Sequence, residues 1–196
     1  MSRIERAFNL CLGLSVLSWS LLALLQPFAV PRLVIAALNA VVGVLLLARA
    51  PLLVSGSARA LALSLPGVAI AGLAIKLSAP LEAWSQVATA LFAAGGVVAA
   101  ASFLALGRSF AILPALRSIA IAGPYRVVRH PAYLGELLMV LACLLAGPSW
   151  PTAIAAGAAV PLVVLRIHLE ERLLARDPRY QSYSERTRFR LVPGLW

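Results

Sequence analysis

Long runs of apolar residues alternate with short polar segments along most of the chain. A helix needs about 20 mainly apolar residues to cross the roughly 30 Å hydrocarbon core of a bilayer, and several runs approach that length. They cover residues 8–26, 33–48, 60–77, 84–106, 132–146 and 150–165. The pattern predicts an all-α protein, a polytopic transmembrane helical bundle of about six spans, with five as the alternative count.

The last two runs are short for full spans, because a helix of about 16 residues is roughly 24 Å long. Only residues 147–149, a Gly-Pro-Ser sequence, separate the two runs, so we expect a tight helical hairpin. Residues 166–176 contain no Gly or Pro. The second helix should therefore continue until Asp177-Pro178 ends it.

The basic residues are divided unevenly between the two ends of these spans. If the N-terminus is cytosolic and there are six spans, the outer loops hold only Arg32 and Lys76, and every other Arg lies on the inner side. Cytoplasmic loops are enriched in Lys and Arg, so the distribution predicts a multi-pass membrane protein with both termini in the cytosol. A basic rim beside anionic lipid headgroups also explains the net charge of +10 without nucleic-acid binding.

The composition excludes an ordinary soluble domain, since 62% of the residues are hydrophobic and 12% are charged, against roughly 25% charged in soluble domains. Residues 1–106 contain almost no ionisable group inside a run and should form an N-terminal transmembrane scaffold of about four helices. Small residues such as Gly95 and Gly96 would let these helices approach closely. Cys11 and Cys143 lie in apolar runs without metal-ligand spacing, so no metal site is indicated.

Residues 107–196 have a different character and should carry the chemistry. This region comprises an interfacial loop, the helical hairpin at 132–165 and a polar C-terminal tail. Loops of more than about 15 residues are usually functional or disordered, and the loop at 107–129 has apolar residues spaced along it. It contains Arg108, Arg117, Arg126 and Arg129. We expect it to lie along the cytosolic interface and to form the floor of a site.

Two polar clusters bracket the hairpin, which should bring them together at one face. The first contains Gly123-Pro124-Tyr125-Arg126 and Arg129-His130-Pro131-x-Tyr133-x-Gly135, and the second is Arg166-x-His168-x-Glu170-Glu171. Arg166 and Glu170 are four residues apart on a helix and share a face beside apolar residues, which fits either an ion pair or a functional site. His130 precedes a proline at a helix start, where it could be an interfacial cap or a site residue.

These motifs, together with Tyr180-x-x-Tyr183 and Pro193, resemble the isoprenylcysteine carboxyl methyltransferase family and its phospholipid methyltransferase relatives. The resemblance covers about residues 106–196. It implies an integral membrane enzyme that uses S-adenosyl-L-methionine, with S-adenosyl-L-homocysteine as product, in a pocket formed by the C-terminal catalytic region. It also implies a lipophilic acceptor, small or part of a lipidated molecule, that arrives from the bilayer, and it requires no metal.

The resemblance also implies roles for individual residues. The expected cofactor-binding residues are Gly123, Tyr125, Arg129, His130, Pro131, Tyr133, Leu134, Gly135, Glu171, Tyr180 and Tyr183. Carboxylates, aromatic faces and polar backbone groups suit a cofactor that carries a sulfonium cation, an amino acid head and an adenosine.

Arg166 and Glu170 are the expected catalytic residues. Arg166 would orient a carboxylate acceptor by bidentate hydrogen bonds, as in isoprenylcysteine O-methylation. Glu170 would act as a base for a phospholipid amine or a thiol. The sequence leaves these acceptors open, and it leaves Glu136 open between serving the pocket and bonding a nearby Arg. It indicates no oligomeric state.

Two alternatives come from other classes of protein. A membrane reductase related to sterol reductases would use a nicotinamide cofactor, but it would need more spans than 196 residues readily supply. A non-enzymatic membrane subunit or channel would use the arginine-rich rim only to contact a partner. Binding of S-adenosylmethionine distinguishes the methyltransferase from both.

Overall fold

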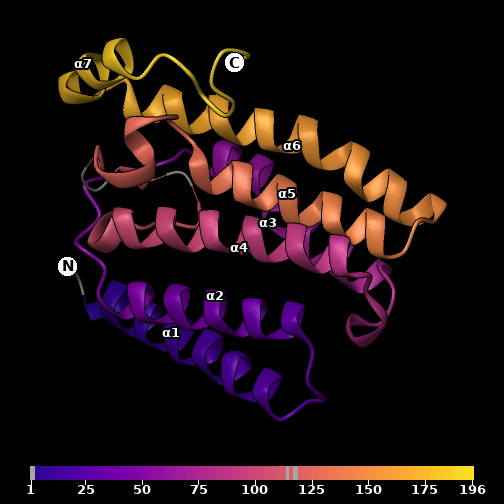
Figure 1. Cartoon of the computed structure of the whole chain (residues 1–196). Coiled ribbons are helices and arrows are strands. Elements are labelled where there is room, and N and C mark those ends of the chain that lie inside the picture. The colour runs from indigo at the N-terminus through magenta and orange to yellow at the C-terminus, as the bar shows by residue number, and fades with distance from the viewer. Residues whose placement is uncertain (1–2, 114, 117–118) are drawn as a thin grey trace.

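The computed structural model describes residues 3–113, 115–116 and 119–196; Arg117 of the expected loop lies outside the described residues. Figure 1 shows the helices running back and forth across one bundle. The long helices are α1 (Arg3–Leu24), α2 (Val30–Leu47), α3 (Ala58–Leu77), α4 (Gln86–Leu106), α5 (Pro131–Ala146) and α6 (Trp150–Leu174). The short elements are η1 (Leu81–Ala83), η2 (Gly107–Ser109), η3 (Gly123–Arg126), α7 (Pro178–Arg186), β1 (Val54–Ser55) and β2 (Ala115–Leu116).

The predicted polytopic helical bundle is confirmed. Among the described residues, five helices are long and apolar enough to cross a membrane, and α5, with 16 residues, is an apolar helix below that length. Helix α6 is longer than its apolar run, because it continues through the polar residues to Leu174 and has 25 residues. It ends slightly before the expected Asp177-Pro178, which instead begins α7 with the Asp177 side chain accepting a hydrogen bond from the Arg179 N–H.

The helices form three closely packed pairs, α1 with α2, α4 with α5 and α3 with α6. One buried apolar cluster joins helices α3 to α6, and a second lies between α1, α2 and Phe110. Helix α1 packs on α2, α2 lies against α4, α4 packs along α5, and α3 contacts both α5 and α6 (Figure 1). Phe92 and Trp84 meet edge to face in the core, with ring centroids 5.2 Å apart. Large apolar side chains such as Trp19, Leu22 and Ile154 are exposed on the outside of the bundle. An apolar exterior of this kind fits a lipid environment, where helices gain nothing by burying such side chains.

Helices α4 and α5 touch through their backbones at a pair of glycines. A Cβ atom at Gly95 would lie 2.7 Å from the Gly135 carbonyl oxygen, and one at Gly135 would lie 2.6 Å from the Gly95 carbonyl oxygen. A Cβ at the neighbouring Gly96 would lie 2.2 Å from a methyl carbon of Val34 in α2. The expectation that Gly95 and Gly96 allow close helix approach is therefore confirmed.

The arginine-rich segments gather at one end of the bundle. There β1 pairs antiparallel with β2, so that the loop between α2 and α3 is joined to the loop after α4. At the opposite end, Arg32 forms a 2.6 Å ion pair with Glu82. The six helices alternate in direction, so the start of α1 and the end of α6 lie at the same, arginine-rich end (Figure 1).

Replacing Gly135 by alanine should force α4 and α5 apart, because the added methyl group would meet backbone atoms that cannot rotate away. We expect a loss of about 1–3 kcal/mol in the free energy of unfolding, measured as a lower thermal midpoint in detergent. Gly157→Ala in α6 is the matched control, since its added Cβ meets nothing within 4 Å. That variant should be unchanged or more stable by up to about 1 kcal/mol, and an equal loss in both variants would contradict the close contact.

The charge distribution predicts that the arginine-rich end faces the cytosol. In a background with Cys11 and Cys143 replaced by alanine, Gln181→Cys at this end and Leu25→Cys between α1 and α2 supply exposed single thiols. A membrane-impermeant maleimide should label Gln181→Cys only in inverted vesicles and Leu25→Cys only in right-side-out vesicles. The reverse labelling would place both termini outside the cytosol.

Candidate functional site

The end of the chain folds back onto the segment that precedes α5. The Arg129 N–H donates to the Phe189 carbonyl at 2.9 Å, and the His130 N–H donates to the Arg190 carbonyl at 2.8 Å. Pro131, which lacks an N–H, then occupies the first turn of α5. The residue before a proline disfavours helical angles, so the helix begins here and both preceding side chains are held at its N-terminal end.

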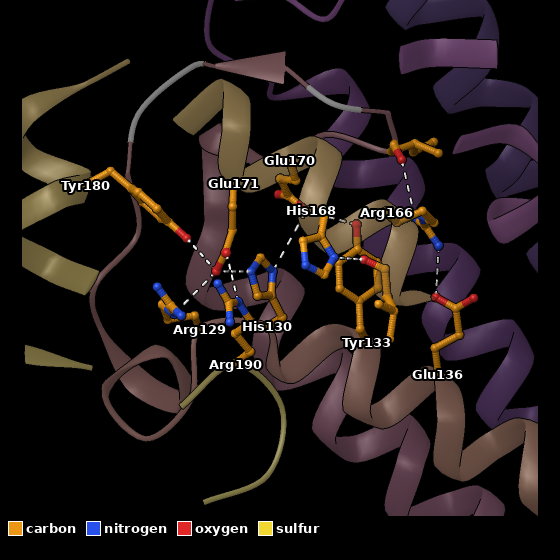
Figure 2. A network of polar contacts seen from close by, with 12 residues as sticks. Arg129, His130, Tyr133, Glu136, Arg166, His168, Glu170, Glu171, Tyr180 and Arg190 are labelled. Atoms are coloured by element: carbon orange, nitrogen blue, oxygen red, sulfur yellow. Dashed lines mark hydrogen bonds and ion pairs between the residues drawn. The ribbon is translucent and has the colours of Figure 1, made fainter. Parts of the chain in front are cut away.

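Glu171 is the centre of a buried polar cluster (Figure 2). Its Oε1 lies 3.2 Å from His130 Nε2 and 3.3 Å from Arg129 Nε, and it accepts a hydrogen bond from the Tyr180 hydroxyl at 3.2 Å. Its Oε2 accepts from Arg190 Nε at 2.8 Å. The carboxylate thus binds the two arginines, the histidine and α7 to the end of α6.

Glu170, the neighbouring carboxylate, points into a different environment. Successive residues of a helix are about 100° apart around its axis, because there are 3.6 residues per turn. The Tyr133 hydroxyl donates to Glu170 Oε2 at 2.9 Å, and His130 Nδ1 lies 3.9 Å from the same oxygen. The Glu170 side chain is 34% exposed, against 13% for Glu171. One glutamate is therefore enclosed by cations, whereas the other faces a cavity.

Arg166 joins three parts of the bundle. Its NH1 group donates to Glu136 Oε2 at 3.0 Å and to the Gly67 carbonyl at 3.1 Å, and NH2 donates to the Ile112 carbonyl at 3.4 Å. The guanidinium also lies 4.6 Å from the centre of the Tyr133 ring, which is a cation–π contact. Gly67 makes room for this side chain, since a Cβ there would lie 2.3 Å from Arg166 Cδ.

The spacing of Arg166 and Glu170 fits either an ion pair or a functional site. Among the described residues, these two side chains do not form an ion pair. Arg166 pairs with Glu136, which confirms the suggestion that Glu136 bonds a nearby Arg. The second carboxylate oxygen of Glu136, Oε1, is buried and has no hydrogen-bond partner in the described part of the chain. Leaving a buried polar atom unpaired is costly, so this oxygen is a candidate contact for a bound molecule.

A cavity of about 400 Å³ runs from these polar groups into the bundle. Its volume falls in the range of roughly 300–1,000 Å³ that is usual for small-molecule sites. Its polar end is lined by Tyr125, Arg129, His130, Tyr133, Arg166, Glu170, Tyr180 and Tyr183, and its apolar lobe by Leu38, Val42, Val68, Ala71, Ala99, Phe103 and Met139. Residues of the loop after α4, including Phe110, Ile112 and Ile119, also line it, which agrees with the expected floor.

The remaining cofactor-binding candidates lie around this cavity rather than in its lining. Glu171 contacts the lining residue His130 from outside the cavity, and Pro131 is the first residue of α5. Leu134 packs in a separate cluster with Val163, Ile167 and Leu191, and Gly135 forms the contact with α4. Gly123 has a φ of 59°, the left-handed region that favours glycine, at the start of η3.

Three buried tyrosines close the part of the cavity at the arginine-rich end of the bundle. Tyr125, Tyr180 and Tyr183 form one cluster, and the Tyr183 hydroxyl donates to the Tyr125 carbonyl at 2.7 Å. Burial raises the pKa of Tyr183 to about 12 and also raises the pKa values of Tyr125 and Tyr180 above the ordinary value. The three side chains therefore remain neutral hydroxyls at physiological pH.

Two site residues were missed by the sequence analysis. Asn39 lines the cavity from the middle of α2, in the part of the chain for which the sequence predicts only a transmembrane scaffold. An amide inside an apolar run was the available signal, because polar groups at that depth are costly and usually functional. Arg190 binds Glu171, but in the sequence it is one of many arginines in a basic tail.

The fold and the cavity together define an integral membrane protein with an enclosed polar pocket at one end of its helices. Residues 84–180 match the family model described as phospholipid methyltransferase. The match covers just under half of the chain and confirms that its motifs resemble this group of membrane methyltransferases. No curated protein matches the chain. In the described residues, no group of three or more His, Cys, Asp or Glu side chains could hold a metal ion.

Proposed function

We propose that the chain is an S-adenosylmethionine-dependent methyltransferase that acts on a lipophilic acceptor at the cytosolic face of the membrane. The observation that carries the proposal is that one cavity joins a charged, aromatic end to an apolar lobe. A polar methyl donor and the reacting group of a lipid can meet only where two such environments are continuous. The family match supports methyl transfer, and the mixed polar and apolar lining supports binding of a methyl donor next to its acceptor.

The polar end of the cavity fits S-adenosylmethionine, which when bound supplies an electrophilic methyl group on a sulfonium. Arg129 and His130 are suited to its carboxylate, and the Tyr125, Tyr180 and Tyr183 faces to its cation or adenine. Arg129 Nε is buried and lies 3.3 Å from Glu171 Oε1, but within the described residues it forms no hydrogen bond. The candidates that lie around the cavity but outside its lining would keep the lining residues in position. They are Gly123, Pro131, Leu134, Gly135 and Glu171.

The apolar lobe fits the hydrocarbon part of the acceptor. Its lining comes from α2, α3, α4 and α5, so residues 1–106 would supply much of the acceptor wall in addition to a scaffold. Asn39 and the unpaired Glu136 Oε1 offer polar contacts within this largely apolar lining. The acceptor would reach the polar end from the bilayer with its reacting group toward Glu170 and Arg166.

Glu170 favours an acceptor that must lose a proton, and among these a phospholipid amine. The carboxylate faces the cavity, and Tyr133 fixes its Oε2. A positioned carboxylate of this kind can take a proton from an amine as it is methylated. The description of the matching family agrees with this acceptor. A thiol would use the same base.

An isoprenylcysteine carboxylate is the second candidate acceptor, favoured by the presence of Arg166 in the cavity lining. Arg166 could orient a carboxylate by paired hydrogen bonds. However, its terminal nitrogens already donate to Glu136, Gly67 and Ile112. A carboxylate would have to replace some of these partners, whereas Glu170 can receive a proton without any rearrangement.

Titration calorimetry of the purified chain in detergent tests the cofactor. The wild-type chain should bind S-adenosylmethionine, and Glu171→Gln should weaken binding on the order of tenfold or more, because hydrogen bonds to a charged group contribute about 1.5–3 kcal/mol. His130→Ala should weaken it similarly. Glu185→Gln, in an exposed position on α7, should bind like the wild type. No binding by a wild-type chain with a cooperative thermal transition would exclude the proposal.

Transfer of a labelled methyl group tests the acceptor, with phosphatidylethanolamine and a farnesylated cysteine compared in the same vesicles. We expect methylation of the amine, with kcat lowered roughly 10²–10⁴-fold by Glu170→Gln, as for loss of a general base, and with cofactor affinity largely retained. Methylation of the farnesylcysteine carboxylate alone, with sensitivity to Arg166→Lys and little to Glu170→Gln, would favour the second acceptor.

A further inference from the structure

A second hollow lies at the arginine-rich end of the bundle, beside α1 and α2. It is an open pocket of about 590 Å³ lined by Arg6, Leu47, Ala48, Arg49, Pro51 and Arg108. None of these residues lines the cavity proposed for methyl transfer. The two sites are therefore distinct.

Three separate elements each contribute one arginine to this pocket. Arg6 lies near the start of α1, Arg49 just after α2, and Arg108 in η2 after α4. Arg6 and Arg108 are exposed. The nearby Glu5 accepts a hydrogen bond from the Leu52 N–H at 3.3 Å, and it is not in the pocket lining. Among the described residues, the lining thus carries three positive charges and no carboxylate.

The pocket is held in shape by contacts of the backbone and of Arg49. The Ala50 N–H donates to the Arg108 carbonyl at 2.8 Å, which joins the end of α2 to η2. Arg49 Nε donates to the Phe110 carbonyl at 3.1 Å, and its NH1 group donates to Asn9 Oδ1 at 3.2 Å. The fold itself therefore brings the three arginines together, and no ligand is needed to position them.

The chemistry of the pocket matches a lipid phosphate. Guanidinium groups bind phosphate oxygens through charged, directional hydrogen bonds, and Leu47 and Pro51 add an apolar wall. The pocket lies beside the start of α1 and the end of α2, two helices that are long and apolar enough to cross a membrane. In a bilayer, the ends of such helices lie near the lipid headgroups. We propose that it binds the phosphate of an anionic phospholipid in the leaflet that faces the arginine-rich end.

Not every arginine at this end belongs to the pocket, which allows a matched control. Arg59 in α3 and Arg172 in α6 are also exposed but do not line it. A general attraction between the basic rim and anionic lipids would involve all four residues alike. A specific site requires only Arg6 and Arg108 among them.

Native mass spectrometry of the full chain, titrated with phosphatidylglycerol or phosphatidylcholine in detergent, tests the proposal. The wild type should retain phosphatidylglycerol in preference to phosphatidylcholine. The double variant Arg6→Gln, Arg108→Gln should weaken phosphatidylglycerol binding on the order of tenfold relative to the double variant Arg59→Gln, Arg172→Gln. Arg6→Gln alone should give a smaller loss in the same direction, and it keeps η2 intact should the double variant unfold.

Three outcomes would overturn the proposal. They are equal retention of the two lipids by the wild type, equal losses in the two double variants, and displacement of the lipid by inorganic phosphate at the concentration of the lipid itself. The last would assign the pocket to a soluble anion. The test uses no methyl donor or acceptor, so its result is independent of the proposed function.

Discussion

The site depends on one guanidinium placed among apolar helices. Arg166 extends from α6 to α3 at Gly67, to α5 at Glu136 and to the loop after α4 at Ile112. A cation in such surroundings is stable only when it is paired and fully hydrogen-bonded. Each of these segments must therefore be in place for the charge to be compensated, and the same arrangement leaves the cavity between them.

The two adjacent glutamates lie on different sides of α6 and therefore have different surroundings. Glu171 is surrounded by Arg129, Arg190 and His130, so its charge is used to hold the pocket together. Glu170 receives one hydrogen bond from Tyr133 and keeps contact with the cavity. A single turn of helix thus provides one carboxylate enclosed by cations and one that lines the cavity.

The sequence was sufficient for those features that depend on local composition. Apolar runs gave the helices, and the short Gly-Pro-Ser connection gave the hairpin that brings His130 to Glu171. Which side chains of two helices meet could not be derived in this way. The partner of Arg166 is Glu136, because packing of α5 on α6 decides which face of each helix meets the other. Spacing along one helix allows Glu170 as a partner, and the sequence leaves Glu136 with no particular arginine. The position of Asn39 beside the cavity likewise depends on how α2 packs against α4.

The hydrogen bonds from Arg129 and His130 to residues 189–190 have a consequence for the order of assembly. Synthesis proceeds from the N-terminus, so residues 189–190 are made after all six helices. The backbone hydrogen bonds that hold Arg129 and His130, and the contact of Arg190 with Glu171, can therefore form only after these residues have been added. A chain that stopped at the end of α6 would contain every long helix of the bundle but would lack this brace across the start of α5.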